Sequence, residues 1–410
     1  MKKIRTGVVG LGCRGRSLLN TIYATEEAEI VCVCDVYEDR VEEAQKIVEK
    51  QAEKKPAGYT DFSLMLEKEK PEAVYIASSW SEHIRMAIEC LERGIAVGME
   101  VGGACDVQEC WDLVRTYEKT KTPFMLMENC CFDRFELLTT ALVRDGKLGE
   151  IVHCHGAYSH DLRDEVSGGW VNRHYRLDNY LHRNCENYPT HELGPIAKIL
   201  DINRGNRMLS LVSVASKAAG MEAYVNSDKN PDPTLKGRKF AQGDIVSTII
   251  TCADGSTITL TLDTTLPKYY SREFTVRGTK GLCNQEADMI FLEDAVNIHE
   301  FFEPEKTIQK YLGNSKDYME YLPGVWKNIT DEERELGHGG MDFIMFKEFF
   351  GCLRAGEEMP VDVYDAAAWM CITALSEQSV ATGGMPQAIP DFTDGMWVKR
   401  PRKDVKALKS

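Results

Sequence analysis

The first thirty-five residues constrain the fold more than any other stretch of the chain. Ile4 to Val9 is a short apolar run that leads into Gly10-Leu11-Gly12-Cys13-Arg14-Gly15. An amphipathic stretch follows from Ser17 to Ala24, and a second apolar run ends directly before Asp35. A glycine motif alone is weak evidence, but here a strand precedes it, a helix follows it and an acid stands twenty residues beyond Gly15. This context predicts a dinucleotide-binding Rossmann unit.

The glycine turn and the acid predict which dinucleotide is bound. Gly10 permits a tight turn, Gly12 lets the backbone approach a pyrophosphate, and Gly15 lets helix and strand pack closely. A carboxylate at Asp35 accepts hydrogen bonds from the adenosine ribose and repels a 2′-phosphate, which favours NAD over NADP. The residues of this stretch that we predict to bind NAD are Gly10, Gly12, Cys13, Arg14, Gly15 and Asp35. An α/β protein whose glycine turn binds nothing is the alternative.

Length, charge and cysteine usage exclude several protein classes. A chain of 410 residues suggests two or three domains, and a net charge of −15 argues against nucleic acid or an anionic membrane as partner. No run of eighteen apolar residues is present, so no membrane span is predicted. Cys32, Cys34 and Cys90 lie inside apolar runs and are interpreted as buried thiols of a reducing compartment. The prediction is a cytoplasmic protein without an export signal.

Strands and helices alternate as far as residue 128, which predicts an α/β Rossmann domain with a doubly wound parallel sheet. Asp106 is expected to cap a helix from Val107 to Thr120. Ligands of such sheets lie at the carboxyl ends of the strands. Those ends carry the remaining residues predicted to contact the nicotinamide and its ribose, which are Ser79, Trp80, His83, Glu100 and Asn129.

The pattern changes after a linking helix from Asp133 to Asp145. Residues 129–385 are predicted to form an α+β domain with an open, mostly antiparallel sheet, and Asp254-Gly255 supplies a hairpin turn. The expected strands are Ile151 to Ser159, Leu209 to Lys217, Asp244 to Cys252, Ser256 to Thr264 and Ser271 to Arg277. Two further helices are expected after the sheet, from Asp342 to Ala355 and from Val363 to Thr382. One face of such a sheet needs cover, which predicts a homo-oligomer. The tail, residues 386–410, is expected to pack back on the first domain.

The densest group of polar residues runs from Tyr158 to His191, and most of it is interpreted as a solvated loop. His191 falls in the first turn of an apolar helix, where the helix dipole favours a neutral imidazole able to accept a proton. A capping or core role is its alternative. Tyr158 beside cations can serve as a general base, although a single tyrosine is more often a packing residue. His153, Cys154 and His155 alternate in side along a strand, so we predict no metal site there.

Several stretches of the sequence resemble those of a known enzyme superfamily. The first domain resembles the Gfo/Idh/MocA oxidoreductases, which usually carry Glu-Lys-Pro where this chain has Glu100-Val101-Gly102. Nearly the whole chain is similar to one branch of that superfamily, the NAD-dependent α-N-acetylgalactosaminidases. The matching stretches are Glu109-Cys110-Trp111, residues 127–131, Gly156-Ala157-Tyr158 with residues 160–162, Tyr188-Pro189-Thr190-His191 with residues 193–195, Tyr269-Tyr270-Ser271-Arg272, residues 278–281, residues 338–342 and residues 362–366.

The resemblance implies a glycosidase that retains and recycles NAD. In that family the sugar C3 hydroxyl is oxidised, a base removes the acidified C2 proton, the aglycone leaves from C1, water adds, and C3 is reduced again. Carried over by motif, Tyr158 is the C2 base and His191 assists deprotonation of the hydroxyl. Residues implied to hold the sugar are Glu128, Arg176, Tyr188 and Tyr270. The chain departs from the family pattern before Tyr188 and at Glu192, where a glycine is usual, so the sugar, its anomer and the aglycone stay open.

Three functions are compatible with the sequence. The first is the glycosidase acting by oxidation, elimination, hydration and reduction. The second is a sugar or cyclitol dehydrogenase, or a glycoside 3-dehydrogenase, that releases NADH and a keto product. Val101 in place of the lysine counts against that second function. The third is a non-catalytic, cofactor-bound sensor or assembly partner.

Overall fold

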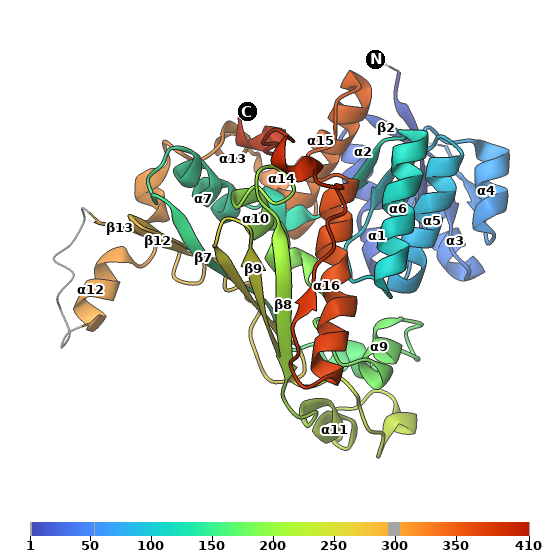
Figure 1. Ribbon diagram of the computed structural model, residues 1–410. Coiled ribbons are helices and arrows are strands. Elements are labelled where there is room, and N and C mark those ends of the chain that lie inside the picture. The colour runs from blue at the N-terminus through green and yellow to red at the C-terminus, as the bar shows by residue number, and fades with distance from the viewer. Residues whose placement is uncertain (1, 53, 294–303, 410) are drawn as a thin grey trace. The chain divides into compact units, whose positions relative to one another are not determined.

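The computed structural model describes residues 2–52, 54–293 and 304–409. Its contacts divide the chain into two compact units, and Figure 1 labels many of their elements. The first unit comprises Met1–Phe132, Asn328–Cys371 and Val405–Ala407, and the second comprises Asp133–Lys327, Ile372–Asp404 and Leu408–Ser410. Each unit is therefore built from segments that are distant in the sequence, whereas the sequence predicted an uninterrupted first domain up to residue 128 and an uninterrupted second domain from 129 to 385.

The first unit contains a six-stranded parallel sheet with the order β3-β2-β1-β4-β5-β6. Its strands are β1 Ile4–Val9, β2 Ala28–Cys34, β3 Ala57–Tyr59, β4 Ala73–Ile76, β5 Ala96–Met99 and β6 Phe124–Leu126. Its helices include α1 Cys13–Ser17, α2 Leu19–Ala24, α3 Glu38–Ala52, α4 Phe62–Glu69, α5 Trp80–Glu92, α6 Val107–Thr120, α14 Asp331–Arg334 and α15 Met341–Ala355. Strands β4 and β5 are buried along their whole length, because helices cover both faces of such a sheet. The predicted Rossmann domain is confirmed.

Local signals place two helices of this unit. The Asp106 carboxylate accepts a hydrogen bond from the Glu109 N–H at 2.9 Å and completes a capping box, which confirms the predicted cap of α6. The amphipathic stretch predicted as one helix is instead divided into α1 and α2 at Leu18, and α1 begins four residues earlier than expected. The earlier start carries the helix up to the glycine turn.

Helix α15 belongs to the first unit, where its apolar side chains are buried against other elements. Of its side chains, Phe343, Phe346, Phe349 and Phe350 are buried, and the ring of Phe346 lies 5.1 Å from that of Tyr75 on β4. The sequence predicted the helix but placed it in the second domain, since chain order alone does not show which sheet a buried helix covers.

The second unit contains an eight-stranded mixed sheet with the order β13-β12-β11-β7-β10-β9-β8-β14. Among the described strands of this sheet, only β7 and β10 form a parallel pair. The strands are β7 Ile151–Ser159, β8 Met208–Ala215, β9 Ile245–Cys252, β10 Thr257–Asp263, β11 Thr275–Gly278, β12 Gly281–Asn284, β13 Met289–Leu292 and β14 Gln387–Ala388. The mostly antiparallel sheet is confirmed, although β11 begins four residues later than predicted. Gly255 has φ +90° in the β9–β10 hairpin, as the Asp-Gly turn requires.

Helices cover one face of this sheet. The helices of the unit are α7 Arg134–Arg144, α8 Arg163–Ser167, α9 Arg176–His182, α10 Thr190–Ile199, α11 Gly220–Val225, α12 Pro304–Tyr311, α13 Gly324–Lys327 and the second half of α16 Val363–Ala381. Helix α10 packs so closely on β7 that a Cβ added at Gly156 would lie 2.8 Å from the Glu192 carbonyl oxygen. Tyr158 therefore stands at the end of β7 on the face that α10 covers, together with Cys154. The predicted polar loop contains the short helices α8 and α9.

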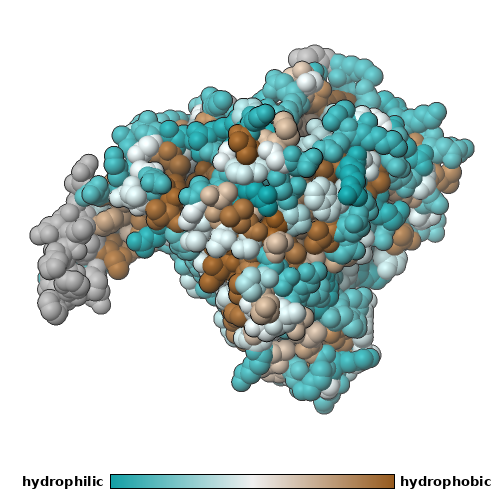
Figure 2. Space-filling view, viewed as in Figure 1, coloured by the Kyte–Doolittle hydropathy of each residue, from teal (hydrophilic) through white to brown (hydrophobic). Residues whose placement is uncertain are grey.

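The opposite face of the sheet alternates polar and apolar residues and stays accessible. Val214 on β8 and Ile249 on β9 are exposed at 55% and 53%. Figure 2 shows hydrophobic atoms over the strands of this sheet. His153 and His155 are on this face, and Cys154 between them is buried on the other, as the alternation predicts.

The tail divides between the two units. Residues 405–407 belong to the first unit, where the Glu348 carboxylate accepts the N–H groups of Lys406 and Ala407 at 2.6 and 3.1 Å. The other described residues of the tail, 386–404 and 408–409, belong to the second unit. There the Arg144 guanidinium binds Asp404 at 2.8 Å.

Among the described residues, none of the helices is both long enough and apolar enough to cross a bilayer. The three cysteines that the sequence places in apolar runs are buried. Burial raises the pKa of the Cys32 and Cys34 thiols to about 12, so both remain protonated at neutral pH.

Candidate active site

The glycine turn of the first unit has the geometry that a pyrophosphate needs. Gly10 has φ +82°, and a Cβ there would lie 2.4 Å from the backbone of Ala77. A Cβ at Gly15 would lie 1.9 Å from the Gly10 carbonyl oxygen. Only glycine fits at either position without moving the backbone. Around Gly12 the nearest atom to an added Cβ is the Arg40 Nη1 at 3.8 Å, so the turn is open on the side of the helix start.

Asp35, which directly follows β2, forms a hydrogen bond with this turn. One carboxylate oxygen accepts the Leu11 N–H at 2.7 Å, and the other accepts the Tyr37 N–H at 3.0 Å. The Arg40 guanidinium lies 3.8 Å from the same carboxylate. These contacts hold the acid beside the glycine turn, where a dinucleotide's ribose is bound in such folds. The residues present fit NAD.

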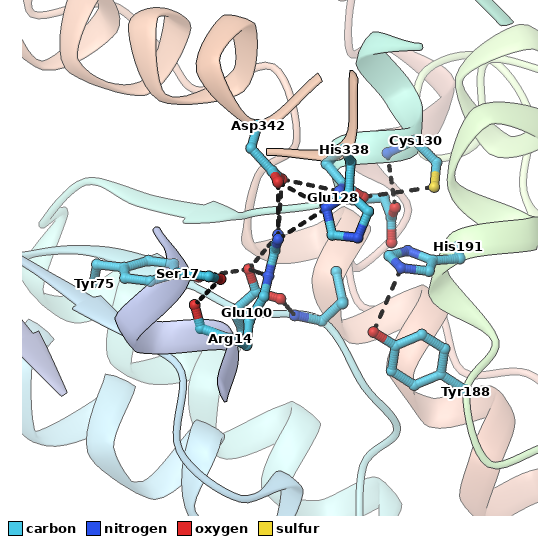
Figure 3. A network of polar contacts seen from close by, with 12 residues as sticks. Arg14, Ser17, Tyr75, Glu100, Glu128, Cys130, Tyr188, His191, His338 and Asp342 are labelled. Carbon is cyan, nitrogen blue, oxygen red and sulfur yellow. Dashed lines mark hydrogen bonds and ion pairs between the residues drawn. The ribbon is translucent and has the colours of Figure 1, made fainter. Parts of the chain in front are cut away.

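Arg14, in the same turn, is the centre of a polar network that Figure 3 shows. Its guanidinium forms two hydrogen bonds of 2.8 Å with the Asp342 carboxylate and one of 3.1 Å with Glu100. The Asn129 side-chain amide donates to Asp342 at 2.9 Å, and the Tyr75 hydroxyl donates to Glu100 at 2.6 Å. The structure thus brings together Arg14, Glu100 and Asn129, which the sequence predicted separately as cofactor residues.

Asp342 and His338 complete the network, and sequence reasoning did not assign them a role. The His338 Nδ1 lies 2.8 Å from the Asp342 carboxylate. Burial works to raise the pKa of Asp342, but Arg14 and His338 together hold that pKa well below its usual range. Burial likewise opposes the charge of Arg14, yet Glu100 holds its pKa well above the ordinary value. The only sequence signal for Asp342 was its place in the string from His338 to Asp342 that matched the family.

Three predicted residues gather at the start of α5. Ser79 precedes the helix, and its hydroxyl lies 3.1 Å from that of Ser81. Trp80 is buried, and a Cβ at Gly102 would lie 2.3 Å from its indole. The His83 Nε2 lies 2.9 Å from the Ser78 carbonyl oxygen, and burial lowers the pKa of His83 to about 4, so the ring is neutral. The absence of a side chain at Gly102 thus makes room for the Trp80 indole. Gly102 directly follows Val101, which stands where the superfamily usually has lysine.

Two further predicted residues of this unit differ in exposure. Cys13 is exposed at the first position of α1. Glu128, predicted to bind the sugar, follows β6, is fully buried and accepts the Cys130 N–H at 3.1 Å.

In the second unit, four aromatic side chains gather where β7 ends and α10 begins. The ring of Tyr158 lies 4.5 Å from that of Tyr188 and 5.8 Å from that of His191. The Tyr188 hydroxyl lies 3.5 Å from the His191 Nε2, a contact also drawn in Figure 3. The ring of His160 lies 4.9 Å from that of Tyr158. The predicted base and the predicted histidine are therefore neighbours, and the ring of Tyr188 contacts both.

Arg176 and Tyr270 border this group. The Arg176 guanidinium lies over the Tyr188 ring at 5.4 Å and pairs with Glu165 at 3.2 Å. Its charge also interacts with Tyr158. Tyr270 lies 5.3 Å from His160, and its hydroxyl accepts a hydrogen bond from Arg272 at 3.1 Å. The structure therefore brings together four of the predicted sugar-site residues, which are Tyr158, Arg176, Tyr188 and His191. The fifth, Tyr270, contacts His160, which in turn contacts Tyr158.

His160 is a member of the group that sequence reasoning did not single out. Burial, and then the charge of Arg176, lower its pKa to about 4, so the ring is neutral. Its Nε2 is buried without a hydrogen-bond partner among the described residues. A buried, unsatisfied ring nitrogen beside two tyrosines can bind a hydroxyl group. Its position two residues after Tyr158 was the available signal.

Two tyrosines in contact with arginine side chains, together with the His160 and His191 rings, suit a polyhydroxylated ligand. Tyrosine and histidine can take and return protons, and a nearby guanidinium stabilises a phenolate. The first unit supplies the glycine turn, the ribose acid and neutral polar groups at the strand ends. The first unit therefore suits binding of a redox cofactor, and the aromatic group of the second unit suits proton transfer to and from hydroxyl groups.

Comparisons with known proteins agree with both halves of the chain. Residues 4–127 match the oxidoreductase family with an NAD-binding Rossmann fold, and residues 132–399 match the C-terminal domain of glycosyl hydrolase 109. The chain is 35% identical to an alpha-N-acetylgalactosaminidase of Tannerella forsythia, over 97% of this chain and 88% of that protein. It is 38% identical to an alpha-N-acetylgalactosaminidase of Bacteroides fragilis, over 97% of this chain and 93% of that protein.

Solved structures show the same fold at lower identity. A levoglucosan dehydrogenase in complex with NADH and levoglucosan has a TM-score of 0.70 and 16% identity, over 95% of this chain and 100% of that one. The myo-inositol 2-dehydrogenase of Lactobacillus plantarum has a TM-score of 0.65 at 16% identity, with 95% and 100% coverage. The expected family is confirmed: the protein belongs to glycosyl hydrolase family 109, a glycoside hydrolase built on an NAD-binding Rossmann oxidoreductase fold.

Proposed function

We propose that the protein hydrolyses an α-N-acetylgalactosaminide or a related glycoside without net oxidation, using a retained NAD. NAD supplies reversible oxidation of the sugar's C3 carbinol. A carbonyl at C3 acidifies the neighbouring C2–H, so that the bond from C1 to the aglycone can break by elimination instead of through an oxocarbenium ion. Membership of the family and the contact between Tyr158, Tyr188 and His191 support this proposal.

The residues of the second unit divide the proton transfers between them. His191 takes the proton of the C3 hydroxyl as the carbinol is oxidised and returns it when C3 is reduced. Tyr158, as a phenolate favoured by Arg176, removes the C2 proton as the aglycone leaves C1 and returns a proton to C2 when water adds to C1. Tyr188, Arg176 and Tyr270 orient the sugar through its hydroxyl oxygens. Overall one water is consumed and one glycosidic bond is broken.

The decisive experiment follows aglycone release and the hydrogen at C2 together. Aryl glycosides that differ at C2 and C4 are incubated with purified protein in deuterated water, without added NAD. We expect release of nitrophenol, no accumulation of NADH, and one deuterium at C2 of the freed sugar. Stoichiometric NADH with a keto product would instead assign the dehydrogenase function. Hydrolysis with the original hydrogen retained at C2 would contradict the elimination step.

Replacing Asp35 by Ser is expected to weaken NAD binding about tenfold to hundredfold, because two ribose hydroxyls lose a charged acceptor. Arg40 is already 3.8 Å from that carboxylate, so NADP binding should strengthen as Arg40 becomes able to pair with a 2′-phosphate. Fluorescence titration of apoprotein with NADH and NADPH measures both changes. Asp35→Ser with Arg40→Met is the control, and the gain for NADPH should disappear in it. An unchanged preference in Asp35→Ser would contradict the assignment.

We further propose that a second copy of the chain covers the open face of the larger sheet. The exposure of Val214 and Ile249 supports this arrangement, since one face of an open sheet needs apolar cover. Light scattering of Ile249→Lys against the unmodified protein tests it: the variant should have the mass of the single chain.

A further inference from the structure

Two buried glutamates flank, in the sequence, the segment from Tyr188 to His191. Glu186 lies two residues before Tyr188, and Glu192 follows His191 directly. Their exposed fractions are 0% and 1%. Neither has a role in the proton transfers proposed above, and a buried acid is costly unless something compensates it.

Three of the four oxygens of these two carboxyls lack a hydrogen-bond donor among the described residues. One oxygen of Glu186 accepts the Tyr188 N–H at 3.3 Å. The other oxygen of Glu186 and both oxygens of Glu192 are buried without a hydrogen-bond partner among the described residues. The two carboxyl groups nevertheless interact directly with each other. Since carboxylate oxygens only accept, a hydrogen bond between these two groups requires a proton on one of them.

The surroundings favour that proton. Burial raises the pKa of Glu186, and burial followed by the charge of Glu186 raises the pKa of Glu192. The groups that face Glu192 from packed elements are the Tyr158 backbone amide on β7 and, more weakly, the Glu273 carboxylate before β11. Glu186 is faced by the Tyr188 amide and by Glu192, and its own N–H donates to the Ser376 hydroxyl of α16 at 2.8 Å. None of these groups is a cation.

The same contacts connect the pair to the sugar site. The backbone of Glu192 packs on Gly156, two residues before Tyr158, and its carboxyl faces the Tyr158 amide. The carboxyl of Glu186 holds the Tyr188 amide. A hydrogen bond between the two acids would therefore link the backbone at Tyr158, near the end of β7, to the backbone at Tyr188, just before α10.

We propose that Glu186 and Glu192 share one proton and act as a positioning pair that fixes Tyr158 against Tyr188 and His191. In its effect on turnover, this role depends on the proposed function. An ordinary glycosidase acid and nucleophile is the rival role for two glutamates, but those carboxyls must reach the glycosidic bond. Side chains exposed at 0% and 1% do not.

The pair has a defined pH signature. The folded protein retains a proton that the unfolded chain loses near the ordinary glutamate pKa of 4.5. Stability from this group is therefore complete below that value and falls as the pH rises toward the raised folded pKa. For each such proton the unfolding equilibrium constant should rise about tenfold per pH unit in that window.

Glu192→Gln and Glu186→Gln test the proposal, because glutamine donates a hydrogen bond without titrating. Denaturant unfolding from about pH 5 to about pH 8 should show a shallower pH dependence in each variant than in the unmodified protein. Hydrogen exchange at the Tyr158 and Tyr188 amides should be slower in Glu192→Gln than in Glu192→Ala at the same pH. The infrared band of a protonated, buried carboxylic acid should be lost in both glutamine variants. Glu222→Gln, whose partner is the exposed Lys239, is the matched control and should change none of these.

Turnover provides the second readout. Glu192→Gln should keep kcat within about threefold at neutral pH and extend activity on the alkaline side, while Glu192→Ala should lower kcat more than it raises KM. Parallel pH slopes of unfolding in Glu192→Gln and unmodified protein, or a folded Glu192→Gln with no turnover, would overturn the proposal. The unfolding, exchange and infrared results need no glycosidase activity, so a failure of the proposed function is recognised separately.

Discussion

Tyr158→Phe is expected to lower glycoside turnover by about a hundredfold to ten-thousandfold, the usual contribution of a general base. The variant removes a single oxygen and keeps the ring that packs 4.5 Å from Tyr188. Folding should therefore be preserved, and KM should change little, because the lost proton transfer belongs to the reaction and not to binding of the sugar. Initial rates with an aryl glycoside, combined with denaturant unfolding, separate the two effects.

The position of the label makes this test specific. In deuterated water, exchange at the sugar's C2 should fall in Tyr158→Phe together with aglycone release, because both require removal of the same proton. Tyr224→Phe is the matched control: this tyrosine belongs to the same unit and its hydroxyl lies 3.5 Å from Asp164, away from the aromatic group. Turnover within about tenfold of the unmodified protein after Tyr158→Phe would contradict the assigned base.

Arg14→Met should destabilise the first unit by about 2–4 kcal/mol. The substitution leaves the carboxylates of Asp342 and Glu100, exposed at 0% and 7%, without their shared cation. This loss of stability is smaller than that for a fully buried ion pair, because the Arg14 side chain is 27% exposed to solvent. Since the network adjoins the glycine turn, NAD binding should weaken as well. Denaturant unfolding followed in the first unit measures the stability change.

Arg16→Met is a control two residues along the same helix. Its partner Glu43 is 56% exposed, so its loss should cost about 0–1 kcal/mol. Arg14→Lys should recover part of the stability but not the two parallel hydrogen bonds to Asp342. The pKa of Asp342 is held below its ordinary 3.8, so the network contributes stability above that pH and loses it as the pH falls further. Arg14→Met should lose this acid dependence. Equal effects of Arg14→Met and Arg16→Met would contradict the role of the network.

Local sequence signals predicted the bounds of some elements closely. Helix α6 was expected from Val107 to Thr120 and has these bounds, because Asp106 supplies a cap that depends only on near neighbours. Strand β7 was likewise expected from Ile151 to Ser159 and has these bounds. Period and capping are properties of short segments, so one sequence suffices to find them.

Long-range partners were not accessible in the same way. Asp342 meets Arg14 across 328 positions of the chain, and no local pattern marks that pairing. Helix α15 was found by its apolar residues, but its assignment to the first unit depends on Phe346 meeting Tyr75. The group around Tyr158 was predicted through family resemblance, whereas His160 required coordinates to show its unsatisfied nitrogen. Residues supplied by distant segments are the ones that a single sequence leaves undetermined.

The discontinuous first unit has a consequence for synthesis on the ribosome. Its sheet would be complete once β6 emerges, but Val361 and Met370 still have to supply carbonyl oxygens to the Leu126 and Ala104 N–H groups, at 3.1 and 3.0 Å. The phenylalanines of α15 are also made only after the second unit's central strands. A nascent chain that ends near residue 330 would thus expose the apolar surface that α15 covers. With this order of segments in the chain, we expect a chaperone to bind that surface until translation is nearly complete.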